Sequence, residues 1–235
     1  MSKKKDSTFQ PPLYAALALA FSSFGDAFLY PFLPLYGQDL GMTVAWIGTL
    51  LSINRFARIF TNSIIARACG IYGFRLMTVL AVILAIISTA GYALASGITG
   101  WVICRIFWGL SFSVLRLSAI TYSLDHERQG FSLGLSKSIQ EAGPMITLLA
   151  APLLFQMETT INFLILSITS LPALYFAIRL PAKFTAIAPF SLKGFFKIPS
   201  TFNLLTFCSA ILIEGILVVT IGVLFLRYSE NISVL

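Results

Sequence analysis

Charged residues are scarce in this sequence. Asp, Glu, Lys and Arg together make up 11% of the 235 residues, whereas hydrophobic residues make up 57%. A soluble globular domain carries about 25% charged residues. The low charge content excludes an ordinary soluble domain and favours a chain that is dissolved mainly in lipid.

Histidine and cysteine are also rare, with one histidine and three cysteines in the chain. Cys69, Cys104 and Cys208 lie in three different apolar segments and show no metal-ligand spacing. His126 lies in a polar turn, so no histidine inside an apolar segment could activate a Ser or Cys nucleophile. There is no Gly-rich phosphate loop. We expect no metal site and no cofactor, and we do not expect an enzyme.

The basic residues do not form a nucleic-acid-binding face. The formal net charge is +7, but the Lys and Arg residues occur singly at the ends of apolar runs. That distribution is typical of the positive-inside rule of membrane proteins. We therefore expect a lipid bilayer around the chain and no nucleic-acid partner.

The chain contains seven apolar stretches that are long enough to cross a bilayer, at about 20 residues each. The sequence thus predicts an all-α polytopic membrane protein, with a bundle of six transmembrane helices over residues 13–180 and a seventh helix after it. A cytoplasmic tail is predicted at residues 1–12 and a cytoplasmic linker at 181–198, followed by residues 199–235 as the first helix of an incomplete C-terminal half. The predicted helices span residues 13–36, 42–66, 75–95, 98–122, 131–156, 160–180 and 199–227.

The distribution of basic residues predicts the orientation. Nearly all bases outside the predicted helices fall in the tail and in the loops after the second, fourth and sixth helices, whereas the opposite side holds only Arg227. The positive-inside rule then places the N-terminus in the cytoplasm. We expect a multi-pass protein of an inner or plasma membrane.

Several ionisable residues lie inside the predicted membrane helices. An ionisable side chain within a bilayer costs at least about 2.5–3.5 kcal/mol, so such residues usually face a protein interior or a water-filled path. Their presence on several helices predicts a transport path. These residues are Asp26, Arg55, Arg58, Arg105, Arg116, Lys137, Glu141 and Glu214.

The rise of about 1.5 Å per helical residue places Asp26, Arg105 and Glu214 in one layer near the middle of the membrane. A carboxyl group whose neighbours change as a protein moves can bind and release a proton, so Asp26 and Glu214 are candidate proton carriers with Arg105 as the counter-charge. A static buried ion pair that fixes the helix register is the alternative. Glu141 can also pair with Lys137 one turn earlier on the same helix.

A substrate cavity is predicted beside this layer, with Arg55, Tyr30, Trp108 and Glu141 as candidate lining residues. The excess of basic over acidic side chains in the helices would suit an anionic solute. Arg58 and Arg116 can either bind a ligand or extend their guanidinium groups to the membrane surface.

The fifth predicted helix carries small residues at four-residue spacing, which allows close approach of a neighbouring backbone. The two series are Gly130, Gly134 and Ser138, and Ser132 and Ser136. Pro144 in this helix, and Pro31 and Pro34 in the first, predict breaks, since proline removes a helical hydrogen bond. Broken helices beside buried charges indicate a substrate site, although packing alone would also explain them.

Four local patterns together resemble the major facilitator superfamily, in particular its drug:proton antiporter branch. Arg105, Trp108 and Gly109 resemble the Arg-x-x-Gln-Gly motif of the fourth helix, with Trp in place of Gln. Asp26 and Tyr30, followed by two prolines, resemble the acidic and proline-rich end of the first helix. The resemblance covers nearly the whole chain, and it implies that Arg105 takes part in proton coupling.

The other two patterns match in part. Gly143 and Pro144 resemble the core of the antiporter motif of the fifth helix, and Gly73 and Arg75 fit the gating motif after the second helix. In the family these motifs shape the helices and the inner gate. The positions that depart from the two motifs are Ile139, Thr147, Leu148, Ala66, Gly70, Ile71 and Phe74.

The resemblance implies a twelve-helix fold made of two six-helix halves, each an inverted 3+3 repeat, of which this chain would supply one half and a seventh helix. It further implies proton-coupled transport of a small organic solute by alternating access, in the export direction, together with a missing C-terminal half or a partner chain. Proton-driven uptake of an anionic solute, a truncated product, and a membrane binding or assembly subunit without transport are the alternatives.

Overall fold

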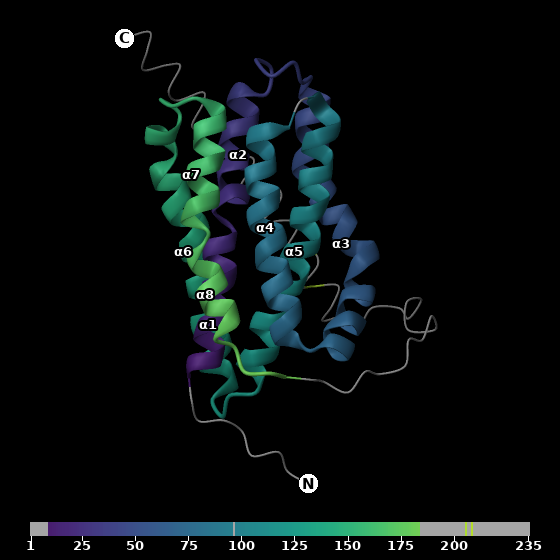
Figure 1. The fold of residues 1–235 in the computed structure, drawn as a ribbon, viewed down its shortest axis with the longest axis vertical. Helices are drawn as coiled ribbons and strands as arrows, with labels where there is room; N and C mark the ends of the chain where they lie inside the picture. The colour runs from purple at the N-terminus through teal and green to yellow at the C-terminus, as the bar shows by residue number, and fades with distance from the viewer. Residues whose placement is uncertain (1–8, 96, 184–204, 206–207, 209–235) are drawn as a thin grey trace. The chain divides into compact units, whose positions relative to one another are not determined.

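The computed structural model describes residues 9–95, 97–183, 205 and 208. The chain divides into two compact units, residues 1–187 and 188–235. Almost all described residues belong to the first unit, which is a bundle of α-helices (Figure 1). Of the predicted helix at residues 199–227, only residues 205 and 208 are described, and Glu214 lies outside the described residues.

The helices of the first unit agree closely with the predicted stretches, and the all-α fold is confirmed. Their bounds are α1 (Gln10–Ser22), α2 (Phe24–Tyr36), α3 (Val44–Tyr72), α4 (Phe74–Leu94), α5 (Gly97–Leu124), α6 (Gln129–Leu154), α7 (Thr159–Thr169) and α8 (Pro172–Ile178). The largest difference is at the end of α3, which continues six residues beyond the predicted end at residue 66 and stops one residue before Gly73.

Two of the predicted helices are interrupted near a serine. Helices α1 and α2 form one candidate membrane span, residues Gln10–Tyr36, and α7 and α8 form another, Thr159–Ile178. The Ser23 hydroxyl donates to the carbonyl of Ala20, and the Ser170 hydroxyl donates to that of Leu166, both at 2.8 Å. Serine hydroxyls that bond back to the preceding turn often bend helices.

The predicted breaks at prolines are wrong. Helix α2 runs through Pro31 and Pro34, and α6 runs through Pro144. Neighbouring helices and local adjustments make prolines tolerable inside membrane helices. The predicted tail is also three residues too long, because α1 begins at Gln10, and Pro11 and Pro12 occupy its first turn, where a missing N–H costs no helical bond.

The helices of the bundle differ in polarity. Besides the two composite spans, α4 and α5 are long and apolar enough to cross a membrane. Helices α3 and α6 are longer than α4, with 29 and 26 residues, but they carry the bundle's Arg55, Arg58, Lys137 and Glu141. Polar faces on these two helices are expected where helices border protein or water rather than lipid.

Helix α5 occupies a central place in the bundle. It packs against α3 and α4 and also contacts α1 and α6, while α4 packs against α7 and α8 (Figure 1). Helix α1 packs mainly on α6 and α8, and α2 packs mainly on α6. A residue on the inner face of α5 is therefore surrounded by several helices.

The buried apolar residues form two clusters that are separated along the helices. One cluster takes residues 15–19 of α1 and 114–122 of α5, and the other takes residues 28–33 of α2 and 101–104 of α5. Between these stretches lie buried or half-buried polar residues, which we call the mid-bundle layer. Its members are Ser22, Ser23, Asp26, Asn54, Ser88, Thr89, Arg105, Ser111 and Ser113.

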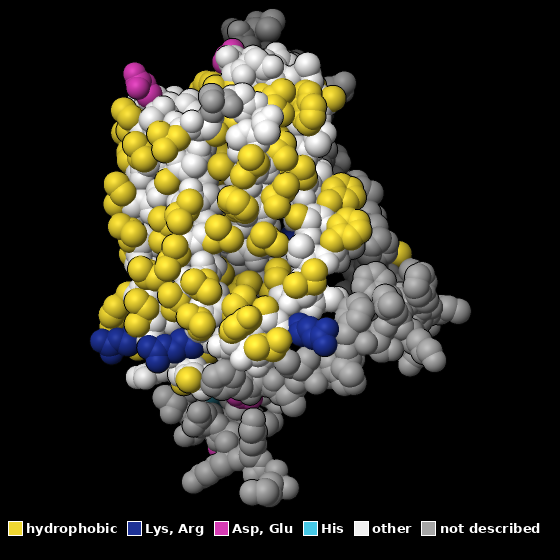
Figure 2. Space-filling model, turned by 45° about the vertical axis from the view of Figure 1, so that its right-hand side comes forward, with side chains coloured by type: hydrophobic (Ala, Val, Ile, Leu, Met, Phe, Trp, Pro, Cys, Tyr) yellow, Lys and Arg dark blue, Asp and Glu magenta, His cyan; other side chains and the backbone are white. Residues whose placement is uncertain are grey.

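The outer surface of the bundle is largely apolar. Figure 2 shows one face covered by hydrophobic side chains, with Lys and Arg side chains in a band near one end. Many large hydrophobic residues are exposed, including Leu94 at 81% and Phe60 at 76%. Surfaces of this kind are stable in lipid and are rare on soluble monomers.

Of the two predicted series of small residues on α6, the serine series lies on the buried face and the glycine series does not. A Cβ atom added at Gly130 or Gly134 would meet nothing within 4 Å, so no described backbone approaches there. Ser132 and Ser136 are buried instead, at 0% and 3% exposure. The close approach occurs at Gly143, further along the same buried face.

The chain after α8 is fastened to the ends of two other helices. The N–H of Phe74, at the start of α4, donates to the carbonyl of Lys183, and the Tyr122 hydroxyl of α5 donates to the carbonyl of Pro181. The Lys183 ammonium donates to the carbonyl of Thr121 at 2.7 Å and pairs with Asp125. We call this arrangement the Lys183 anchor.

Candidate functional site in the mid-bundle layer

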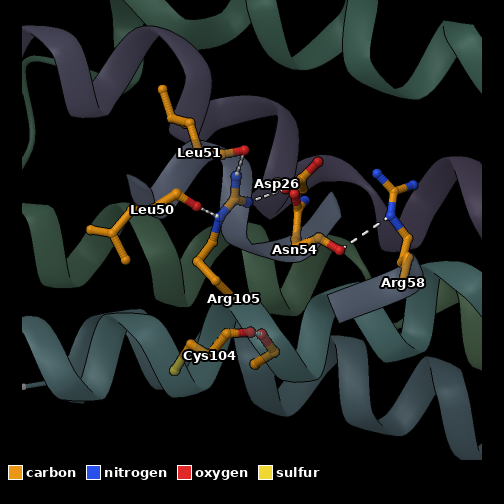
Figure 3. Close-up of polar contacts among 8 residues, drawn as sticks. Asp26, Leu50, Leu51, Asn54, Arg58, Cys104 and Arg105 are labelled. Carbon is orange, nitrogen blue, oxygen red and sulfur yellow. Dashed lines mark hydrogen bonds and ion pairs between the residues drawn. The ribbon is translucent and has the colours of Figure 1, made fainter. Parts of the chain in front are cut away.

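Arg105 is the central residue of the candidate site. Its side chain is fully buried, and its three guanidinium nitrogens all have partners (Figure 3). Nε donates to the carbonyl of Leu50 at 2.8 Å, and Nη2 donates to that of Leu51 at 3.4 Å. Nη1 donates to a carboxylate oxygen of Asp26. A buried charge is tolerated when it is paired and hydrogen-bonded in this way.

Three helices combine to hold the Asp26–Arg105 ion pair. Asp26 lies in the first turn of α2, Arg105 lies on α5, and the two carbonyl groups come from α3. Asp26 is 15% exposed, whereas Arg105 is completely enclosed. The structure thus brings together two of the three residues that were predicted to share a layer. Glu214 is not among the described residues.

Asn54 is a member of the site that the sequence analysis did not single out. It is 4% exposed, and its backbone carbonyl accepts a hydrogen bond from Nε of Arg58 at 3.2 Å (Figure 3). Its side-chain oxygen has no hydrogen-bond partner among the described residues. The available signal was an amide directly after an apolar stretch of α3, because a buried polar side chain normally needs partners.

Gly109 explains how α3 and α5 come close enough for these contacts. A Cβ atom at this position would lie 2.9 Å from the carbonyl oxygen of Asn54 and 3.2 Å from its Cα. Only glycine leaves room for the α3 backbone at this point. The glycine of the fourth-helix pattern therefore has a packing reason in this chain.

The predicted cavity residues are placed in different ways. The ring of Tyr30 lies 5.8 Å from the Arg105 guanidinium and is 37% exposed. Arg55 is exposed on α3. Trp108 is buried at 2% exposure, and its indole N–H has no partner among the described residues. Glu141 forms an exposed ion pair with Lys137 on α6, as predicted, and not with the mid-bundle layer.

The remaining motif residues have structural roles at helix contacts and turns. Gly143 lies against the end of α1, where an added Cβ would be 2.3 Å from the carbonyl oxygen of Ala20, and Pro144 follows it inside α6. Gly73 joins α3 to α4 with φ of 86°, which L-residues rarely adopt. Arg75 is exposed in the first turn of α4.

Comparison with known proteins adds the family. A search of curated proteins finds no match. The Major Facilitator Superfamily family model matches residues 15–234, which is nearly the whole chain. Together with the apolar helices, this match identifies a multi-pass integral membrane protein. The chain belongs to the major facilitator superfamily, a family of secondary transporters that move solutes across membranes.

Proposed function

We propose that the chain takes part in proton-coupled export of a small organic solute, in the manner of the drug:proton antiporter branch that it resembles. In this proposal Asp26 carries the proton and Arg105 is the fixed counter-charge, with Glu214 as a second proton carrier. The observation that carries the proposal is the Asp26–Arg105 pair in the middle of the bundle.

The partners of Arg105 suit a fixed charge. If Asp26 took up a proton, the guanidinium would lose its carboxylate partner but would keep the carbonyl groups of Leu50 and Leu51. Arg105 therefore has reason to stay in place while Asp26 changes state. The greater exposure of Asp26 gives its carboxylate, and not the arginine, access to a proton.

The remaining parts of the proposal follow from the family. Alternating access needs a second wall, supplied by a C-terminal half or a partner chain. Arg55, Tyr30 and Glu141 have exposed side chains that could contact a solute, and Trp108 would contact it only after a movement of the helices. We place the N-terminus in the cytoplasm of an inner or plasma membrane, because exposed basic side chains form a band at one end of the apolar surface (Figure 2).

The test is a flux measurement with Asp26→Asn, which keeps the size and the hydrogen-bonding capacity of the side chain but cannot titrate. The complete protein is reconstituted in liposomes, and a pH gradient is imposed in either direction. Flux of two probes, ethidium and phenyl phosphate, is measured with and without the gradient. We expect wild-type flux to respond to the gradient and Asp26→Asn flux to be independent of it.

Two results would overturn parts of this proposal. Gradient-driven flux that is unchanged in Asp26→Asn would remove the proton-carrying role of Asp26. Flux in the same direction as proton movement would show uptake and would contradict export. Lys137→Gln is the matched control, since it removes a membrane charge outside the mid-bundle layer and should leave the coupling intact.

A further inference from the structure

Two arginines of the bundle share a single aromatic ring. The guanidinium carbon of Arg58, on α3, lies 4.7 Å from the centroid of the Phe112 ring, and that of Arg116, on α5, lies 6.0 Å from the same centroid. The two guanidinium groups are thus no further apart than the sum of these distances. We call Arg58, Phe112 and Arg116 the twin-arginine site.

The acidic side chains of the described bundle helices are already used elsewhere. Asp26 pairs with Arg105, and Glu141 pairs with Lys137. Neither Arg58 nor Arg116 has a carboxylate within ion-pair distance in residues 9–95 and 97–183. The like charges of this site therefore form no ion pair in the part of the chain that the structure describes, and Asp26, the carboxylate whose charge acts on Arg58, is already bonded to Arg105.

The Arg58 guanidinium uses only part of its hydrogen-bonding capacity within the described residues. Its Nε donates to the carbonyl of Asn54, and in Figure 3 its two terminal nitrogens point away from that carbonyl. Those nitrogens have no hydrogen-bond acceptor among the described residues. A planar guanidinium with both terminal nitrogens available matches the oxygens of a phosphate or carboxylate group.

Position excludes a simple surface role for Arg58. It is half-buried and lies one helical turn from Asn54, a residue of the mid-bundle layer. Arg116 is exposed. Arginines at membrane depth that form no ion pair are costly, so they must face protein, water or a ligand. Arg55, which precedes Arg58 by three residues on the same face of α3, adds a further positive charge.

We propose that the twin-arginine site binds the anionic group of an organic solute, a phosphate ester or carboxylate attached to an apolar body. The assignment of this anion as the transported solute rests on the transport proposed above, whereas its binding does not. Both guanidinium groups lie near the Phe112 ring, and the anion supplies a negative charge that can pair with them. Soluble phosphate esters and anionic lipid headgroups share this chemistry, and the experiment separates them.

The experiment measures equilibrium binding without any pH gradient. The complete protein is placed in nanodiscs of uncharged phosphatidylcholine, and binding of radiolabelled phenyl phosphate is titrated. We expect saturable binding by the wild type and about tenfold weaker binding by Arg58→Gln and by Arg116→Gln, because each removes charged hydrogen bonds to the anion. Arg58→Lys and Arg116→Lys should lose less, since the charge remains.

Two further variants test the geometry. Arg179→Gln is the matched control, because the Arg179 guanidinium also lies over one ring, 5.1 Å from the centroid of Tyr175, and no second arginine of the described residues lies over that ring. It should bind phenyl phosphate as the wild type does. Phe112→Leu should weaken binding less than either Gln variant. Benzyltrimethylammonium, a cation with a similar ring, should not compete.

The possible failures are distinct. Equal binding by the wild type and both Gln variants would overturn the site, as would an equal loss in Arg179→Gln. If phenyl phosphate does not bind, but phosphatidylglycerol raises the thermal midpoint of the wild type and not of the Gln variants, the anion is a lipid headgroup and the solute assignment is wrong. The proposed transport mechanism fails separately: if the wild type binds phenyl phosphate and both Gln variants lose it, but gradient-driven flux is unchanged in Asp26→Asn, the anion site stands and the proton-coupling role of Asp26 alone is contradicted.

Discussion

The two ion pairs within the helices that the structure describes differ in almost every physical respect. Asp26 and Arg105 belong to different helices, and their side chains are 15% and 0% exposed. Lys137 and Glu141 lie one turn apart on α6, and their side chains are 60% and 61% exposed. The first pair joins two helices and is shielded from solvent, whereas the second lies on the exposed surface of a single helix. A polar contact therefore matters for the bundle when it connects helices.

The first prediction breaks the buried pair. In Arg105→Gln the carboxylate of Asp26 would lose its charged partner, and removal of one member of a buried pair costs about 3–5 kcal/mol. We expect a large fall in the free energy of unfolding, measured by titration with denaturing detergent, and loss of gradient-driven flux. An unfolding free energy within experimental error of the wild type would contradict the assigned burial and pairing.

The second prediction compares two glycines of α6. An added Cβ at Gly143 would lie 2.3 Å from the carbonyl oxygen of Ala20, but at Gly134 it would meet nothing within 4 Å. We expect Gly143→Ala to destabilise the bundle by about 1–3 kcal/mol through overpacking. Gly134→Ala should be neutral or stabilising by up to about 1 kcal/mol, since alanine favours helix. A lower thermal midpoint for Gly134→Ala than for Gly143→Ala would contradict the assignment of the buried face of α6.

The third prediction compares two serine hydroxyls. Ser88 on α4 donates to the carbonyl of Cys104 on α5 at 2.6 Å, whereas Ser138 donates within α6 to the carbonyl of Gly134. Ser88→Ala should cost about 1 kcal/mol, the net value of a typical hydrogen bond. Ser138→Ala should have no measurable cost. Equal effects in detergent unfolding would remove the distinction between contacts that join helices and contacts within one helix.

The smallest effect is expected for the exposed pair. Lys137→Gln removes an i,i+4 ion pair, which is worth about 0.3–0.5 kcal/mol at a surface. The change in the thermal midpoint should be small and should disappear at high salt, because exposed charges are screened. A loss of stability as large as that of Arg105→Gln would show that α6 is covered on this face in the complete protein.

The sequence was informative about depth and helix type for clear physical reasons. A fixed rise per residue allowed Asp26 and Arg105 to be placed in one layer before any contact was known. Apolar length identified the helices because the bilayer sets a minimum span. The same reasoning could not reveal Asn54, since its importance depends on the neighbour that Gly109 admits.

The sequence-based predictions were wrong where packing between helices determines which residues face inward and whether a proline breaks a helix. Small residues recur at four-residue spacing on two faces of α6, and only the neighbouring helices determine that Ser132 and Ser136, not Gly130 and Gly134, face inward. The prolines were predicted to break helices because isolated helices do not tolerate them, but the bundle accommodates Pro144. The roles assigned to Asp26, Arg105 and the motif glycines remain predictions.

The Lys183 anchor is a defined point at which a force on the following chain would be transmitted to the helical unit. Pro181 and Lys183 are tied to the first residue of α4 and to the final turn of α5. A pull transmitted along the chain from beyond residue 183 would reach these two helix ends before any other. Because α5 is one continuous helix that also carries Arg105, a force applied at the anchor acts on the helix that holds the buried guanidinium.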